Sequence, residues 1–168
     1  VFGSIDEYVA LIEAAVVRAE ELGDGPPALV CHSMGGLAAR AWLVSEPRNA
    51  TRLRRVITIG TPHRGTWLAR WSHLENGRQM RPDGPWLSAL AEREAAMSPQ
   101  HPWSRFVCWY ANTDNIVFPA DTATLPGADN RLIRGAAHVD LAFHPRVMAE
   151  SLAMLASASS SPSERTIS

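Results

Sequence analysis

The stretch that most constrains the fold is ALVCHSMGGLAARAWL, residues 28–43. A short apolar run ends at Cys31, and the turn His32-Ser33-Met34-Gly35-Gly36 follows at once, before a run of small residues that favour a helix. Small residues let the backbones of a strand and a helix approach closely at such a turn. We therefore expect a buried strand, a sharp turn that carries Ser33, and a helix that begins at Met34.

The rest of the chain continues this alternation of strands and helices. Ser4 and Glu7 fit a capping box at the start of an amphipathic helix that ends before Gly23. We expect further strands at 55–59, 105–110 and 131–134, and further helices at 34–44 and 142–155. Strands that alternate with helices predict an α/β protein with a parallel sheet covered on both faces, and unbroken apolar runs are typical of its buried strands.

Composition indicates one domain without strong charge. The chain has 168 residues and a net charge of −1, with 16 basic residues, all of them Arg, against 17 acidic ones. This balance does not favour nucleic acid or an anionic membrane as a partner. We expect a domain over residues 1–155 and a disordered Ser-rich tail over 156–168. Because the sequence starts with Val1 inside VFGS, we expect its natural N-terminus further upstream, and no localisation is inferred.

The cysteines are predicted to be free. Cys31 and Cys108 lie in two different predicted strands, and the predicted strand at 55–59 lies between them. Two strand spacings of ~4.8 Å each exceed the ~7 Å between Cα atoms that a disulfide tolerates. We expect two buried thiols.

Ser33 is a candidate nucleophile. The run Cys31-His32-Ser33-Met34-Gly35 fits the pattern G-x-S-x-G of a nucleophile elbow, except that Cys31 replaces the first glycine. Cysteine is small, so the tight turn tolerates it. A serine needs a base to remove its proton and a carboxylate to orient that base. The alternative is an ordinary turn between a strand and a helix that happens to contain a serine.

Asp114 and His138 are the candidates for those two roles. Asp114 comes just after the strand at 105–110, and His138 follows the strand at 131–134. Sites in parallel sheets form at the carboxyl ends of strands, and an elbow serine is followed along the chain by its acid and then its base. The three residues occur in that order.

Several residues compete for these roles. Asp121 and Asp129 lie further from a strand end, in a loop with proline and glycine, and are expected to be solvated. His144 precedes Pro145 and is expected to cap the closing helix or to lie at the surface. His138, Asp140 and His144 could also be read as metal ligands, but their spacing matches no strong metal motif, so we expect no metal. We expect His32 to pack beside the elbow, where it is also a candidate for binding substrate.

The motifs VCHSMGGLAAR, VITIGTPHRGTWLA, NTDNIVFP and GAAHVDL resemble those of the α/β-hydrolase superfamily, and within it the bacterial triacylglycerol lipases and related esterases. The resemblance covers the chain from about Ser4 to Leu155, and residues 60–66 carry its most specific part. It implies Ser33 as nucleophile, Asp114 as acid and His138 as base. It also implies a partial form of that fold, since the family's early strands are absent from this sequence.

The resemblance has three further implications. The backbone N–H of Met34 would supply one donor of the oxyanion hole, and the family's second donor comes from a loop after the absent strands. A lid or cap would fall at about 64–104, which is rich in tryptophan. Trp67 and Trp71 are candidates for binding substrate there, with packing inside the segment as the alternative.

The motifs and the resemblance together predict hydrolysis of carboxylic esters, with acylglycerols as the expected substrates, through an acyl-enzyme and without a cofactor. The partners are then a small ester or lipid molecule and, transiently, a lipid surface. Two alternatives stay open. The chain could be a catalytically incompetent fragment of such an enzyme, or it could be a related acyltransferase that excludes water from the acyl-enzyme.

Overall fold

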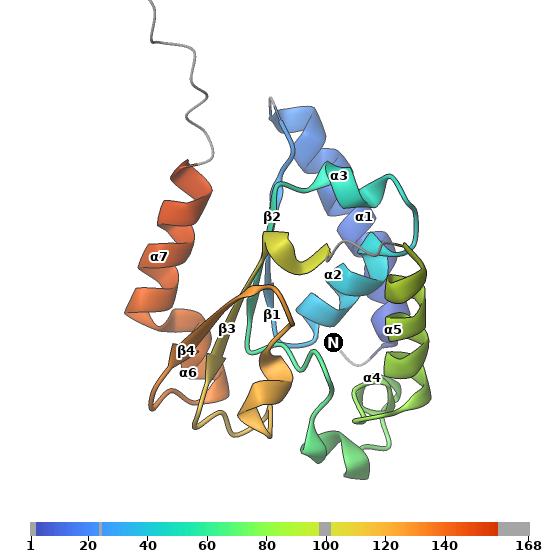
Figure 1. Cartoon of the computed structure of the whole chain (residues 1–168), viewed down its shortest axis with the longest axis vertical. Coiled ribbons are helices and arrows are strands. Elements are labelled where there is room, and N and C mark those ends of the chain that lie inside the picture. Colours follow the sequence, from blue (N-terminus) through green and yellow to red (C-terminus); the bar gives the residue numbers. More distant parts are fainter. Residues whose placement is uncertain (1–2, 24, 98–101, 158–168) are drawn as a thin grey trace, which may run out of the picture.

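The computed structural model describes residues 3–23, 25–97 and 102–157. Its elements follow one another as α1 (Ile5–Leu22), β1 (Ala28–His32), α2 (Gly35–Leu43), α3 (Asn49–Arg52), β2 (Arg55–Ile59), η1 (Trp67–Trp71), α4 (Glu75–Gln79), α5 (Pro85–Met97), η2 (Pro102–Arg105), β3 (Phe106–Ala111), η3 (Ala120–Ala123), β4 (Asp129–Ile133), α6 (His138–Phe143) and α7 (Pro145–Ala156). The η elements are short 3₁₀ helices (Figure 1).

The strands form a four-stranded parallel sheet in the order β1-β2-β3-β4, which confirms the predicted α/β class. Cys31 pairs with Thr58, and Thr58 pairs with Cys108, so β2 separates the two cysteines and both are free as predicted. Cys108 is buried as expected, whereas Cys31, in the edge strand β1, is only partly buried. Because all strands run the same way, their carboxyl ends lie along one edge of the sheet. The loops after His32, Ile59, Ala111 and Ile133 therefore start side by side at that edge.

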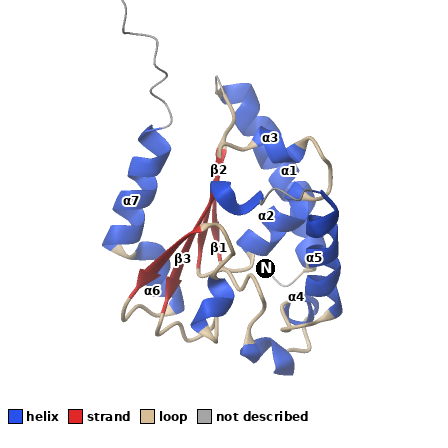
Figure 2. Ribbon diagram, viewed as in Figure 1, coloured by secondary structure: helices blue, strands red, loops and turns tan. Residues whose placement is uncertain are grey.

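Helices cover both faces of the sheet, as the ribbon in Figure 2 shows, with α7 on one side and α1, α2 and α5 on the other. Alternate residues along β2 and β3 point to opposite faces. On the first face Ile57 and Trp109 pack with Val147 of α7. On the second face Val56, Phe106 and Cys108 pack with Val16 of α1 and with Ala39 and Trp42 of α2.

The prediction of a strand buried on both faces is wrong for β1. Val30, in the middle of β1, is 51% exposed, whereas Ile57 beside it in β2 is fully buried. β1 lies at an edge of the described sheet, and the core formed with α6 and α7 includes Ile57 and Trp109 but not Val30. An apolar run in the sequence gives no information about whether a strand is central or at an edge.

The ends of the helices follow their local sequence. Ser4 caps α1 by accepting a hydrogen bond from the Asp6 N–H at 3.2 Å. The predicted closing helix is two helices, α6 and α7, separated at His144 because the residue before a proline disfavours helical geometry. Ala156 still belongs to α7. Ser157 is the C-cap of α7, and the remaining residues of the predicted tail, 158–168, lie outside the described residues.

Residues 64–104 connect β2 to β3 and contain η1, α4 and α5. Two buried contacts hold α4 and α5 against the body of the domain. The Gln79 Oε1 atom accepts a hydrogen bond from the Ile5 N–H at 2.6 Å, and the Glu94 carboxylate binds Arg40 of α2 at 2.8 Å. Across the described part of the chain, no helix combines the length and the apolar character needed to cross a membrane.

Candidate active site

Ser33 occupies the turn between β1 and α2 in a conformation that non-glycine residues seldom adopt. Its φ angle is +53°, in the left-handed region, which marks a strained turn when the residue is not glycine. The turn continues the sheet, because the Ser33 N–H donates to the Ile59 carbonyl at 2.9 Å. Ser33 therefore lies just beyond the carboxyl end of β1, next to the end of β2.

The space around this turn explains its small residues. A Cβ atom added to Gly36 would lie 2.3 Å from the Thr61 Oγ1 atom, which itself donates a hydrogen bond to the Ser33 carbonyl at 2.8 Å. A Cβ on Gly35 would lie 3.6 Å from the Cys31 Cβ, an ordinary contact distance. Glycine is thus required by space at Gly36, and cysteine fits at the first position of the elbow pattern.

Asp114 lies in the loop after β3 with its carboxylate held on both oxygens. Oδ1 accepts the N–H groups of Ile116 at 2.8 Å and Val117 at 2.7 Å, and Oδ2 is 2.9 Å from the His138 Nδ1 atom. Burial of Asp114 opposes its ionisation, but the hydrogen bonds from His138, Val117 and Ile116 outweigh burial and lower its pKa below the ordinary value. A carboxylate with a lowered pKa stays charged and can orient an imidazole.

His138 is the first residue of α6, after β4, and three contacts fix it. Its Nδ1–H points to Asp114 Oδ2, since a carboxylate only accepts. Its backbone N–H donates to the Asn115 Oδ1 atom at 3.0 Å. Its ring lies over Gly60, where an added Cβ would be 3.1 Å from the Nδ1 and Cε1 atoms. Within the described residues, no protein group binds Nε2 of His138, so this nitrogen is free to act on a ligand.

His32, the last residue of β1, lies against His138. The two ring centroids are 4.8 Å apart, and the His32 Nε2 atom is 3.3 Å from the His138 carbonyl oxygen. Burial lowers the pKa of His32 more than the hydrogen bond to the His138 carbonyl raises it, which favours a neutral His32 that donates from Nε2. His32 packs beside the elbow as the sequence predicts.

Met34 precedes α2 directly. Its N–H belongs to the first turn of that helix, where backbone N–H groups have no partner inside the helix and can bind an anionic oxygen. This N–H follows Ser33 directly in the chain, at the start of α2.

The two tryptophans of η1 lie at the surface. Trp67 and Trp71 are 47% and 65% exposed, and their rings meet edge to face with centroids 5.8 Å apart. The backbone N–H of Trp67 donates to the Phe118 carbonyl at 2.9 Å, and this bond joins η1 to the loop that follows Asp114. Ile116 and Phe118 of that loop are exposed as well. The structure therefore brings an exposed apolar surface next to the Asp114 loop.

The competing residues have other partners. Asp121 binds Arg64 at 2.8 Å and Asp129 binds Arg131 at 2.7 Å, both at the surface. His144 caps α7, since its Nδ1 atom accepts from the Arg146 N–H at 3.3 Å. In the part of the chain that the structure describes, no group of three His, Cys, Asp or Glu residues is placed to hold a metal ion.

Sequence reasoning missed several residues that support this site. Asn115 adjoins Asp114 and could have been found from that adjacency. Thr61 and Thr66 belong to residues 60–66, which the sequence singles out only as a family motif. Their roles depend on contacts with distant segments, such as the bond between Thr61 and Ser33, and no local pattern encodes such contacts.

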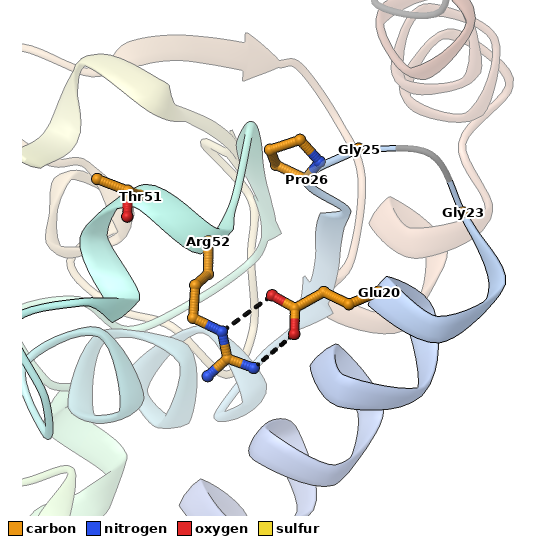
Figure 3. A pocket seen from close by; sticks show the side chains of 6 residues that line it. All are labelled: Glu20, Gly23, Gly25, Pro26, Thr51 and Arg52. Carbon is orange, nitrogen blue, oxygen red and sulfur yellow. Dashed lines mark hydrogen bonds and ion pairs between the residues drawn. The ribbon is translucent and has the colours of Figure 1, made fainter.

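An open pocket lies at the other end of the sheet (Figure 3). It is lined by Glu20, Gly23, Gly25, Pro26, Thr51 and Arg52. Both oxygens of Glu20 bind Arg52, at 2.9 and 2.8 Å, and Arg52 also pairs with Glu13, so the charges at this pocket already have partners. The pocket lies where the chain enters β1, whereas ligands of parallel sheets bind at the carboxyl ends of strands.

Comparisons with known proteins agree with this architecture. The family model described as "PGAP1-like alpha/beta domain" matches residues 23–79. A lipase from Bacillus licheniformis superposes with a TM-score of 0.73 at 16% identity, covering 92% of this chain and 75% of the lipase. Lipase B of Aspergillus fumigatus superposes with a TM-score of 0.72 at 18% identity, covering 92% of this chain and 42% of the lipase.

A gene product of Listeria innocua superposes with a TM-score of 0.64 at 16% identity, and the alignment covers 99% of this chain and 69% of that protein. No curated protein matches the sequence. At these identities the likeness concerns the fold. The sheet and the helices on both faces show that this chain shares the α/β-hydrolase fold of the superposed lipases, and residues 23–79 are similar to a PGAP1-like alpha/beta domain.

Proposed function

We propose that this chain is a serine hydrolase of carboxylic esters, with Ser33, Asp114 and His138 as its catalytic residues. The observation that carries the proposal is the hydrogen bond of 2.9 Å between buried Asp114 and His138, at the edge of the sheet where Ser33 occupies a strained turn. This bond leaves the His138 Nε2 atom free to accept a proton, and an imidazole oriented in this way can activate a serine hydroxyl.

The reaction follows from these positions. His138 Nε2 takes the proton of Ser33 as Oγ attacks the ester carbonyl carbon, and the Met34 N–H stabilises the oxyanion. The C–O bond to the alcohol breaks, and the alcohol leaves with the proton from His138. Water then attacks the acyl-enzyme, again with His138 as base, and the carboxylic acid is released from Ser33. Asp114 orients the imidazole and stabilises its charged form throughout.

We further propose that the substrates carry hydrophobic acyl chains, and that residues 64–104 form a cap beside the site. The support is the apolar surface of Trp67, Trp71, Ile116 and Phe118 next to the Asp114 loop. Acylglycerols fit such a surface, and the names of the superposed lipases agree with this class. The ring of His32, close to His138, is proposed to touch the substrate with its exposed edge.

Labelling with a fluorophosphonate probe tests the proposal. We expect one modification, mapped by mass spectrometry to Ser33 and absent in Ser33→Ala. His138→Ala should lose most of the labelling, whereas Ser45→Ala, at a serine after α2, should keep it. A folded chain that does not label would contradict the proposal and favour the incompetent form.

A set of p-nitrophenyl esters of increasing chain length then tests the substrate class. We expect kcat/KM to rise with acyl length and Trp67→Ala to reduce that rise. Adding a competing alcohol separates hydrolysis from acyl transfer. Release of the free acid as the main product supports hydrolysis, and ester formation in water would favour the acyltransferase alternative.

A further inference from the structure

Thr66 makes two hydrogen bonds with one hydroxyl, and both go to the same loop. Its Oγ1 atom donates to the Ile116 carbonyl at 2.5 Å and accepts the Phe118 N–H at 3.2 Å. The side chain is buried, at 4% exposure for the residue, so water does not readily replace these bonds. Thr66 therefore fixes the backbone on both sides of Val117.

The loop that Thr66 fixes is the one that holds the carboxylate of Asp114. The N–H groups of Ile116 and Val117 bind Asp114 Oδ1 at 2.8 and 2.7 Å, which leaves Oδ2 for His138. The peptide that follows Ile116 carries both the carbonyl bound by Thr66 and the N–H of Val117. A change in the orientation of this peptide would move both groups together, because a peptide unit is planar.

Thr66 is itself held in place from the opposite side. Its N–H donates to the Met80 carbonyl at 3.0 Å. Gly65 before it has a φ angle of +86°, and a Cβ there would lie 2.7 Å from the Met80 oxygen and the Pro82 nitrogen. The Trp67 N–H after it binds the Phe118 carbonyl. The segment around Thr66 thus joins residues 80–82 to the loop of Asp114.

We propose that Thr66 is a positioning residue for catalysis: its hydroxyl orients the loop 116–118 so that the Asp114 carboxylate presents Oδ2 to His138. The proposal rests on the proposed function for its effect on rate. The effect of Thr66 on the orientation of the Asp114–His138 pair can be measured without any catalytic activity. Thr66 touches neither the substrate nor the reacting atoms in this scheme.

Thr66→Val tests this role, because valine keeps the shape of threonine and can neither donate nor accept. Thr66→Ser keeps the hydroxyl. Thr122→Val is the matched control, since Thr122 is also buried and its hydroxyl donates to the Pro119 carbonyl at 2.7 Å, without binding residues 114–118. We expect Thr66→Val to lower kcat by about 10- to 100-fold with little change in KM, as for other lost supporting contacts. Thr66→Ser and Thr122→Val should stay near wild type.

The proton between His138 and Asp114 gives a readout that needs no activity. We expect a low-field ¹H NMR resonance from His138 Nδ1–H in the wild type that disappears in Asp114→Asn. It should move upfield or broaden in Thr66→Val and persist in Thr66→Ser and Thr122→Val. If Thr66→Val does not fold, Thr66→Ala removes the same hydroxyl with less crowding and is measured in the same way.

Two results would overturn the proposal. One is a Thr66→Val protein with an unchanged low-field resonance and unchanged kcat. The other is a Thr122→Val protein in which the resonance and kcat change as much as in Thr66→Val. The effect would then come from the loss of any buried hydroxyl rather than from the contacts of Thr66. If the wild type does not label with the fluorophosphonate, the proposed function fails, while the resonance still decides whether Thr66 orients Asp114.

Discussion

Arg40 and Glu94 form a buried ion pair with two hydrogen bonds of 2.8 Å each, and the pair joins α2 to α5. The third arm of the guanidinium donates to the His63 carbonyl at 2.5 Å, and the guanidinium carbon lies over the Trp103 ring, 5.2 Å from its centroid. A residue of the helix that follows Ser33 thus binds both the segment 64–104 and the loop after β2. Both charged side chains are less than a tenth exposed, so each buried charge depends on the other for its neutralisation.

This dependence gives the first prediction. Glu94→Gln leaves the Arg40 charge buried without its partner, and breaking a buried pair in this way costs about 3–5 kcal/mol of unfolding free energy. Urea unfolding followed by tryptophan fluorescence measures the change. The double variant Arg40→Met/Glu94→Met removes both charges and should lose less than Glu94→Gln alone. An equal or larger loss in the double variant would mean that the pair itself is strongly stabilising.

The second prediction compares two glycines with positive φ angles. Gly60 (φ +58°) lies under His138, with only 3.1 Å to the ring for an added Cβ, whereas Gly135 (φ +80°) has open space. Alanine at either position lowers the free energy of unfolding by about 1–2 kcal/mol, because it disfavours the left-handed backbone conformation. Gly60→Ala should cost a further ~1–3 kcal/mol from crowding. It should also reduce fluorophosphonate labelling sharply, because it displaces the imidazole, while Gly135→Ala labels normally. Equal labelling of the two variants would argue against tight packing of His138 on Gly60.

The third prediction concerns the dependence of stability on pH. The folded state lowers the pKa of Asp114, so the unfolded chain binds a proton there more readily than the folded one. The resulting stabilisation is fully present above the ordinary value of 3.8 and is lost as the pH falls below it toward the lowered folded value. Asp114→Asn should therefore be less stable than wild type at neutral pH, by about 1.5–3 kcal/mol for the lost charged hydrogen bonds.

The difference between the two proteins should shrink as the solution is acidified below that value. Denaturant melts at a series of pH values measure it. Asp121→Asn is the control, since Asp121 is exposed and its variant should run parallel to wild type. A gap between wild type and Asp114→Asn that stays constant into the acid range would show that the Asp114 charge does not stabilise the fold.

The fourth prediction concerns the thiols. Burial raises the pKa of Cys31 to about 12 and that of Cys108 to about 11. Compared with the ordinary value of 9.0, the reactive thiolate of Cys31 is about 10³-fold rarer at neutral pH, one decade for each unit. Neither thiol should react with Ellman's reagent in the folded protein within the time in which both react in guanidinium. Fast reaction of Cys31 in the folded state would contradict this prediction and show that the reagent reaches its partly buried thiol.

The sequence predicts the strands well, because strands depend on local patterns. The run 55–59 forms β2 with the predicted ends, and the prediction that His144 caps a helix is confirmed. The roles of Ser33, Asp114 and His138 stay predictions. The predicted helix at 142–155 starts too early, because residues 142 and 143 belong to α6 and α7 begins at Pro145, after the cap at His144.

The features that the sequence could not show are contacts between residues far apart along the chain. Arg40 meets Glu94, and Thr66 meets Ile116, across 50 residues or more. The exposure of Val30 depends on what lies beside β1, and a strand's own residues carry no information about its neighbours. The sequence favours Asp114 over Asp121 and Asp129 only because Asp114 follows closely after a predicted strand. The two N–H groups that hold its carboxylate become visible only in three dimensions.

The spatial order of the strands equals their order along the chain. Each strand therefore follows its neighbour in the sheet in the order in which synthesis delivers them from the N-terminal side. His138 emerges after all four strands, and its imidazole is the last of the three proposed catalytic groups to be made. A nascent chain that still lacks it holds a serine without a base. We therefore expect the proposed hydrolytic activity to appear only after the four described strands and His138 have been translated.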